Sequence, residues 1–275
     1  MNDIKARMKS VTGTMQITKA MELVANSKLR RAKERVEKSR PYYETLRKAI
    51  VSLEASGDFV SPFSEQRQGN KSLIIVIAGD RGLAGGYNSN VFKLAERISD
   101  GNAPVFLPIG KKALEYFRHR GREIFTDSAS LTGELGVGDC LALGDAVSSA
   151  FLRGEFDSLY VVYTKFVSMM SQLPVYEKIL PFEKEQDEEA DGNVLIEEEA
   201  EEMLAKIVPQ YVGGIIWSSA CEAVASEHGA RRSAMNAANK NAEEMLDTLM
   251  LKFNRARQAI ITQEITEIVS GAEAL

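Results

Sequence analysis

The segment most suggestive of chemistry is AGDRGLAGGYNSN at residues 78–90, which directly follows the apolar run SLIIVI. A strand that leads into a glycine-rich turn often holds a phosphate, because the backbone amides of the turn surround an anion. The P-loop needs GxxxxGK[ST] and the dinucleotide motif needs GxGxxG, and these glycines match neither spacing, with Lys93 as the next lysine. The glycines therefore predict a tight turn close to another backbone. The alternative is that Asp80 and Arg81 face a partner.

Other residues that could catalyse a reaction or bind a metal are few. The histidines, His119 and His228, have no companions at metal-ligand spacing and are predicted to be ordinary surface residues. Cys140 and Cys221 lie far apart without a CxxC pair, which predicts buried reduced thiols. GxSxG and HExxH are missing from the sequence. We therefore expect no active site, cofactor or metal in the chain itself.

Charge is distributed unevenly along the 275 residues. Residues 1–56 carry thirteen Lys or Arg against six Asp or Glu, whereas residues 183–202 carry eleven acids and one lysine. The basic segment suits nucleic acid, anionic lipid or an acidic protein surface, and charge alone does not choose among them. The longest apolar runs are far shorter than the ~20 residues that span a bilayer. The first residues lack the apolar stretch of a signal peptide, so we expect the protein to stay in the compartment where it is made.

The amino-terminal segment has a heptad pattern. Twelve of fifteen positions at alternating steps of four and three are apolar, which predicts a long coiled-coil helix with Lys and Arg on its outer face. At ~1.5 Å per residue this helix extends about 80 Å. Pro41 is predicted to bend it without ending it, because the seam resumes in phase. The seam positions are Ile4, Met8, Val11, Met15, Thr18, Glu22, Ala25, Leu29, Ala32, Val36, Ser39, Tyr43, Leu46, Ile50 and Leu53.

A second long helix closes the chain, with local weak points predicted at Pro209 and at Gly213 and Gly214. After Ile260 the apolar stripe moves to a different face, so the last turns need a different partner from the rest of the helix. Terminal helices can share one seam only if they run antiparallel, with the middle of the chain inserted between them. The apolar positions at helical spacing are Met235, Ala238, Ala242, Leu246, Leu249, Phe253, Ala256 and Ile260.

The middle of the chain alternates strands and helices, which predicts a mostly parallel sheet. The fold class is thus α/β plus a long antiparallel coiled coil. Its terminal helices, residues 1–57 and 197–275, form a shaft, and a Rossmann-like α/β domain at 70–196 is inserted between them. The acidic residues after 182 are predicted to form a solvated loop. Expected strands are 72–78, 104–109, 123–125, 159–166 and 175–180, and expected helices are 88–98, 111–118 and 137–152.

Four segments together resemble one known family. They are ITKAMELVANSKLRRA with SRPYYETL near the amino terminus, DRGLAGGYN in the glycine-rich segment, ASEHGARRSAMNAANKNA, and FNRARQAIITQEITEIVSGAEAL at the carboxyl terminus. These motifs are similar to those of the γ subunit of the F-type ATP synthase, and the resemblance extends from end to end. It implies an antiparallel coiled coil with an α/β domain packed beside it.

The resemblance also implies a mechanical function. The family's γ subunit is a non-catalytic part of the H⁺-transporting two-sector ATPase, a central rotor shaft that transmits torque between the ion-driven c ring and the catalytic β subunits. The implied partners are three α and three β subunits, the ε subunit and the c-subunit ring, without nucleic acid. The implied location is peripheral, on the cytoplasmic face of the bacterial inner membrane.

Particular residues take roles from this resemblance. Contacts with β subunits are implied for Met21, Arg81, Arg231, Arg257, Gln258 and Thr262. The basic outer face of the first helix is a further candidate for contact with the acidic loop of β. An apolar bearing is expected at Ile260, Ile261, Ile265, Ile268 and Val269, since apolar contacts lack directional hydrogen bonds that break during rotation. A plain continuation of the helix seam is the alternative for these five.

Two other classes of function remain open at this point. One is a nucleotide-binding enzyme built on the central α/β domain, which requires saturable ATP binding by that domain. The other is a basic coiled-coil adaptor, which requires steeply salt-dependent binding to DNA or anionic vesicles.

Overall fold

The computed structural model describes residues 1–56, 61–67, 69–100, 103–126, 132–182 and 200–273, and most of the acidic segment at 183–202 lies outside these ranges. Helix and strand bounds agree closely with the sequence pattern. The elements are α1 (Asn2–Ser56), β1 (Lys71–Ile77), α2 (Tyr87–Ser99), β2 (Ala103–Ile109), α3 (Lys111–His119), α4 (Val137–Leu152), β3 (Ser158–Phe166), β4 (Gln172–Leu180) and α5 (Ala200–Glu273).

The prediction of one strand is wrong. Residues 123–125 form no strand, and they contribute a single parallel bridge between Ile124 and Phe106. The segment follows directly after the turn at Gly121, which has a φ of +63°, and it is too short to build a ladder.

The chain divides into two compact units, and both long helices contribute to each. One unit comprises residues 26–231 and contains the whole sheet. The other comprises residues 1–25 and 232–275, of which residues 2–25 and 232–273 are helical. Each unit is described separately below.

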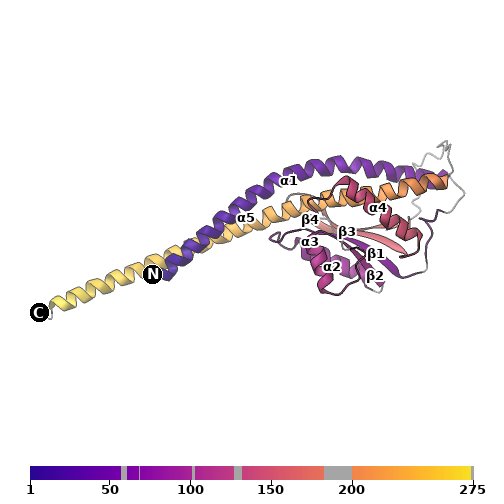
Figure 1. Ribbon diagram of the computed structural model, residues 1–275. Coiled ribbons are helices and arrows are strands. Elements are labelled where there is room, and N and C mark those ends of the chain that lie inside the picture. Colours follow the sequence, from indigo (N-terminus) through magenta and orange to yellow (C-terminus); the bar gives the residue numbers. More distant parts are fainter. Residues whose placement is uncertain (57–60, 68, 101–102, 127–131, 183–199, 274–275) are drawn as a thin grey trace. The chain divides into compact units, whose positions relative to one another are not determined.

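The sheet of the larger unit has the strand order β2-β1-β3-β4 (Figure 1). β1 pairs in parallel with β2 and β3, so that Ile75 is level with Leu107 on one side and Val161 on the other. β4 pairs antiparallel with β3 and forms an edge. The expectation of a mostly parallel sheet is therefore confirmed, with one antiparallel strand added.

Both faces of the sheet are covered by helices. Alternate residues of β1 enter different clusters: Ile75 packs with residues of α4 and α5, and Ile74 packs with residues of α2 and α3. This alternation follows from the two-residue repeat of a strand. Burial at roughly 25 cal/mol per Å² of apolar surface makes these two layers the main source of this unit's stability.

Helix α5 continues unbroken through the residues where weak points were expected. Pro209 lies inside it, and Gly213 serves to bring two helices together. A Cβ at Gly213 would lie 2.8 Å from the Cα of Leu141 on α4. The glycine is therefore needed for close contact between helix backbones. Helix α1 likewise continues through Pro41.

In each unit α1 and α5 lie antiparallel. In the larger unit Ser39 Oγ is 3.3 Å from Ser218 Oγ, and the preceding seam residues of α1 pack on Cys221 and Ala225. In the helical unit Thr18 and Glu22 meet Asn239 and Asn236. The predicted seam is confirmed as the inward face of α1, because every seam residue with a described side chain is buried or half-buried.

Candidate functional site

The glycine-rich segment after β1 is organised around the side chain of Asp80. Its carboxylate accepts hydrogen bonds from the backbone amides of Lys111 (3.1 Å), Thr132 (3.1 Å) and Gly133 (3.2 Å). The first of these amides opens α3. The carboxylate therefore ties the segment after β1 to the start of α3 and to residues 132–133, and Asp80 is an internal anchor.

Gly79 lies close to a side chain and not to another backbone as the sequence predicted, whereas Gly110 nearby makes a close backbone contact. A Cβ at Gly79 would lie 2.8 Å from the carboxyl carbon of Glu227 on α5. Gly110 has a φ of +96°, and a side chain there would collide with the carbonyl of Ala78. Leu83 also has a positive φ of 62°, and its side chain is exposed.

A buried ion pair fastens this segment to α5. Arg231 pairs with Glu227 one turn earlier in the helix and also donates a 3.2 Å hydrogen bond to the carbonyl of Gly82. The Tyr87 hydroxyl donates to the carbonyl of Ala223, at 2.9 Å. Burial raises the pKa of Glu227, although the Arg231 guanidinium pulls that pKa down. These hydrogen bonds hold the glycine-rich segment against α5 at Gly82 and at Tyr87.

His228 differs from the sequence expectation. It is half-buried, and burial together with the cations Arg231 and Lys28 lowers its pKa to about 4. It is a neutral side chain at the edge of the ion pair, in contact with Arg231 at 3.3 Å. Helical periodicity alone could have placed it near the inward face of α5. His119, by contrast, is exposed as expected.

The buried thiols are confirmed. Cys140 and Cys221 are both free and buried, and burial raises the pKa of Cys140 to about 12 and that of Cys221 to about 11. Both thiols are therefore protonated and unreactive at neutral pH. Among the described residues, no group of three or more His, Cys, Asp or Glu side chains is placed to hold a metal ion.

Residues expected to contact other subunits fall into two environments. In the larger unit Arg81 is exposed, whereas Arg231 is buried in its ion pair. In the helical unit Met21 is half-buried, and Arg257, Gln258 and Thr262 are exposed, like the rest of the final turns of α5.

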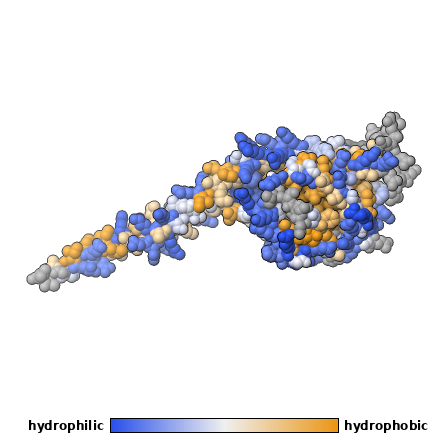
Figure 2. All heavy atoms as spheres, viewed as in Figure 1, coloured by the Kyte–Doolittle hydropathy of each residue, from blue (hydrophilic) through white to orange (hydrophobic). Residues whose placement is uncertain are grey.

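The final turns of α5 expose a set of large apolar side chains. Figure 2 shows apolar residues beside hydrophilic ones along this stretch. Soluble proteins rarely leave such contiguous groups uncovered, so they indicate a surface for a partner. The exposed fractions are 38% for Ile260, 47% for Ile261, 56% for Ile265, 71% for Ile268 and 52% for Val269.

A polar layer interrupts the seam of the helical unit, and sequence reasoning missed it. Thr18 donates to the amide oxygen of Asn239, whose Nδ2 donates to Glu22 at 2.9 Å. Burial raises the pKa of Glu22, but hydrogen bonds from Asn236 and the ammonium of Lys19 outweigh burial and leave that pKa lowered. The signal was the two polar residues in the α1 seam, each of which needs a polar partner.

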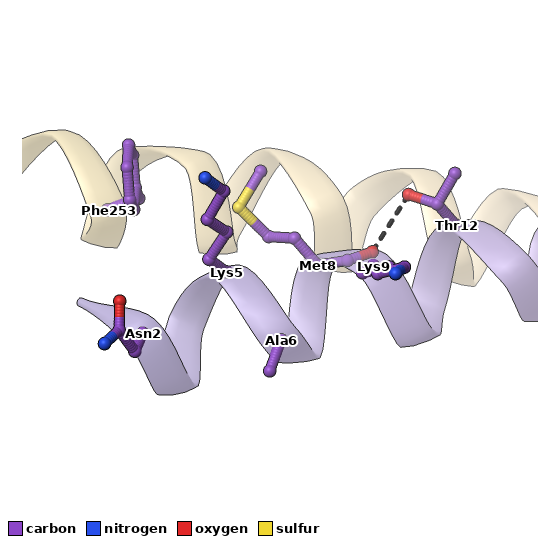
Figure 3. A pocket seen from close by; sticks show the side chains of 7 residues that line it. All are labelled: Asn2, Lys5, Ala6, Met8, Lys9, Thr12 and Phe253. Atoms are coloured by element: carbon purple, nitrogen blue, oxygen red, sulfur yellow. Dashed lines mark hydrogen bonds between the residues drawn. The ribbon is translucent and has the colours of Figure 1, made fainter.

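The same unit contains a groove between the start of α1 and α5, with a volume of about 580 Å³. In Figure 3 Lys5 and Met8 of α1 point toward α5, on which Phe253 lies. We call this the N-terminal groove. Its lining residues are Asn2, Lys5, Ala6, Met8, Lys9, Thr12 and Phe253.

Solved structures similar to this chain come from mitochondrial ATP synthases. A chain in the mitochondrial ATP synthase of Euglena gracilis, in an OSCP/F1/c-ring structure, matches 99% of this chain and 93% of its own length, with a TM-score of 0.70 and 19% identity. A chain of the central stalk and c ring from Tetrahymena thermophila matches 81% of this chain and 99% of its own, with a TM-score of 0.59 and 19% identity. At these identities the likeness concerns the fold.

The sequence family is then defined by closer relatives. The family described as ATP synthase matches residues 1–275. The ATP synthase gamma chain of Ruminococcus albus is 43% identical and covers 99% of this chain and 97% of its own. The sodium-ion-specific ATP synthase gamma chain of Acetobacterium woodii is 41% identical, and the match covers 99% of this chain and 98% of that relative. The chain belongs to the ATP synthase γ-chain family.

No helix within the described residues is both long enough and apolar enough to cross a bilayer.

Proposed function

We propose that this chain is the central rotor shaft of an F-type ATP synthase, transmitting torque between the ion-driven c ring and the catalytic β subunits. The shaft is an antiparallel coiled coil of residues 1–57 and 197–275, and the Rossmann-like α/β domain at 70–196 is inserted between its helices. Family membership and the inward-facing seam of α1 support this arrangement. Two helices joined by such a seam resist twisting better than either helix alone.

The observation that carries the proposal is the uncovered end of α5. Residues 257–270 are all exposed, and they include the five apolar residues from Ile260 to Val269. A helix end of this kind suits an apolar collar in which it turns, because apolar contacts have no directional bonds to break. Arg257, Gln258 and Thr262 supply polar contacts to β on the same turns.

The partners that we propose are three α and three β subunits around the shaft, with the ε subunit and the c ring at its foot. Arg81, exposed at the glycine-rich loop, is proposed to meet an acidic surface of β. Met21 is proposed to contact β from α1, and Arg231 to act by holding the loop in place. Association with the cytoplasmic face of the bacterial inner membrane is peripheral, through the complex.

The shaft is proposed to have no catalytic site. The glycine-rich segment matches neither phosphate-binding spacing, and the Asp80 carboxylate already occupies backbone amides beside it, which argues against the nucleotide-binding alternative. Calorimetric titration of the full chain with Mg-ATP should show no saturable binding. Stoichiometric binding in the micromolar range would favour an enzyme instead.

A carboxyl-terminal deletion tests the shaft directly. Removing residues 257–275 from the complex should lower the number of ions transported per ATP hydrolysed, while the unit of residues 26–231 keeps its fold. Deleting only residues 271–275 is the matched control and should have a much smaller effect. Full coupling after the longer deletion would contradict the proposal.

A further inference from the structure

One stretch of α5 is covered on every side. None of residues 222–231 is exposed, whereas residues 257–270 of the same helix are all exposed. We call residues 222–231 the enclosed segment. A buried polar group is costly unless it has a partner, so the contacts of the polar side chains decide what this segment does. The buried polar and charged residues of the enclosed segment are Glu222, Ser226, Glu227 and Arg231.

Three different parts of the larger unit surround the enclosed segment. Successive residues of an α-helix point about 100° apart, so any three in a row face three directions. Ala225 packs in the apolar cluster of α1, Ser226 contacts β3, and Glu227 lies against the glycine-rich segment. In the larger unit α5 passes between α1 and the sheet (Figure 1). The helix is therefore held around its whole circumference.

The contacts with β3 go to its backbone. The hydroxyl of Ser226 donates to the carbonyl of Thr164 at 2.8 Å. One turn earlier, the carboxylate of Glu222 accepts a 3.3 Å hydrogen bond from the amide of Phe166. Backbone groups of a strand cannot swing away as a flexible side chain does. Glu222 and Ser226 are thus tied to fixed points at the end of β3.

Rotation of α5 about its own axis would break these contacts. A turn of about 100° would carry Ser226 into the place of Ala225, against Leu29 and the other apolar residues of that cluster. The hydroxyl would then be buried without a partner, and so would the carbonyl of Thr164. Apolar contacts alone carry no such penalty, because they have no directional hydrogen bonds.

We propose that the enclosed segment fixes α5 against rotation about its own axis within the larger unit, with Glu222 and Ser226 held by β3 and Glu227 and Arg231 by the glycine-rich segment. Torque on α5 then reaches the sheet through directional hydrogen bonds as well as through apolar packing. This inference rests on the proposed function, since the chain must carry torque. Glu222 and Ser226 are positioning residues that hold the shaft.

The test is coupling under load in the intact complex, purified from membranes and reconstituted into sealed vesicles. Ions transported per ATP hydrolysed are measured while the opposing ion gradient is raised in steps. A shaft that slips should lose ions per ATP more steeply as the gradient rises, because a larger opposing torque acts on α5. A chain that is only less stable should lower the amount of assembled complex and leave the dependence on the gradient unchanged.

Three variants separate these outcomes. Ser226→Ala with Glu222→Leu removes both contacts with β3, and we expect a steeper loss of ions per ATP than in the wild type. Glu222→Gln keeps an oxygen that accepts from the amide of Phe166, so it should follow the wild-type curve more closely than Glu222→Leu. Phe117→Leu is the matched control. Phe117 is buried on the opposite face of the sheet, so this change should lower stability and leave the curve unchanged.

The inference is overturned if Ser226→Ala with Glu222→Leu loses ions per ATP no more steeply than the wild type. An equally steep loss in Phe117→Leu would also overturn it, since lower stability would then account for both results. If the double variant does not assemble, Ser226→Ala alone is measured in the same way and is decided by the same two criteria. Failure of the proposed function looks different, because the purified ion-transporting complex would then lack this chain.

Discussion

Thr18 on α1 and Asn239 on α5 are hydrogen bonded through their side chains, and Asn239 in turn donates to Glu22. In the other unit, Ser39 and Ser218 make the corresponding polar contact. Ser39 follows Thr18 by 21 positions, and Asn239 follows Ser218 by 21 positions. The pairing of α1 with α5 therefore has the same offset in residue number within each unit.

Removing half of the polar layer should destabilise the helical unit. Glu22→Leu leaves the amide of Asn239 partly buried without its acceptor, and we expect a loss of about 1–3 kcal/mol in the free energy of unfolding. The double variant Glu22→Leu, Asn239→Leu replaces the layer with apolar packing and should regain most of that loss. Denaturant unfolding followed by circular dichroism measures both.

The control for that prediction is Lys19→Ala, which removes only an exposed ion-pair partner and should cost less than about 1 kcal/mol. The folded-state pKa of Glu22 is lowered, so the ionised carboxylate stabilises the folded chain. This stabilisation is fully present above the ordinary glutamate pKa of about 4.3, and it is lost as the pH falls through the folded-state pKa. A Glu22→Leu variant as stable as the wild type at pH 7 would contradict this account.

Breaking the buried ion pair should be more costly. Arg231→Met leaves the Glu227 carboxylate buried without its cation, and we expect a loss of about 3–5 kcal/mol. The folded-state pKa of Glu227 is already raised, so the variant should recover stability as the pH falls toward 4.3 and the carboxyl becomes protonated. Arg231→Met combined with Glu227→Gln should be less destabilised than Arg231→Met at pH 7. Equal losses of unfolding free energy in the single and the double variant would show that the charge of Glu227 is unimportant.

His228 should make folding sensitive to acid. Its pKa of about 4 lies below the ordinary histidine value of about 6.5, so the unfolded chain binds the proton more readily between these limits. The stability that depends on the neutral imidazole is therefore lost as the pH falls from about 6.5 to about 4. His228→Gln should show a shallower decline in melting temperature over this range than the wild type. Superimposable pH profiles would exclude this role.

Two glycine-to-alanine substitutions should have opposite effects. At Gly213 an added Cβ meets the α4 backbone, so Gly213→Ala should destabilise by about 1–3 kcal/mol in spite of its better helix propensity. At Gly13 no atom lies within 4 Å of such a Cβ, so Gly13→Ala should stabilise α1 by up to about 1 kcal/mol. Thermal unfolding of the two variants in parallel distinguishes these effects. Stabilisation by both would mean that α4 and α5 separate easily.

Most of the fold was predictable because its elements have strong local patterns. The seven-residue repeat identified the buried face of α1, and the apolar runs identified β1 and β3. The bridge at Ile124 was mistaken for a strand because three residues carry too little pattern to separate the two. The contact that requires Gly213 was not predictable, since only the packing of α5 against α4 shows why a residue of poor helix propensity stands there.

For the candidate site, the sequence by itself determined the family, the two long helices and the apolar end of α5, because these features repeat over many residues or consist of contiguous motifs. Only the tertiary structure decided how single polar residues are used. It turned Asp80 inward onto three amides, placed Arg231 against the carbonyl of Gly82, and matched Glu22 with Asn239. Such contacts join residues that are up to 217 positions apart, and no local pattern records which distant atoms will satisfy a buried polar group.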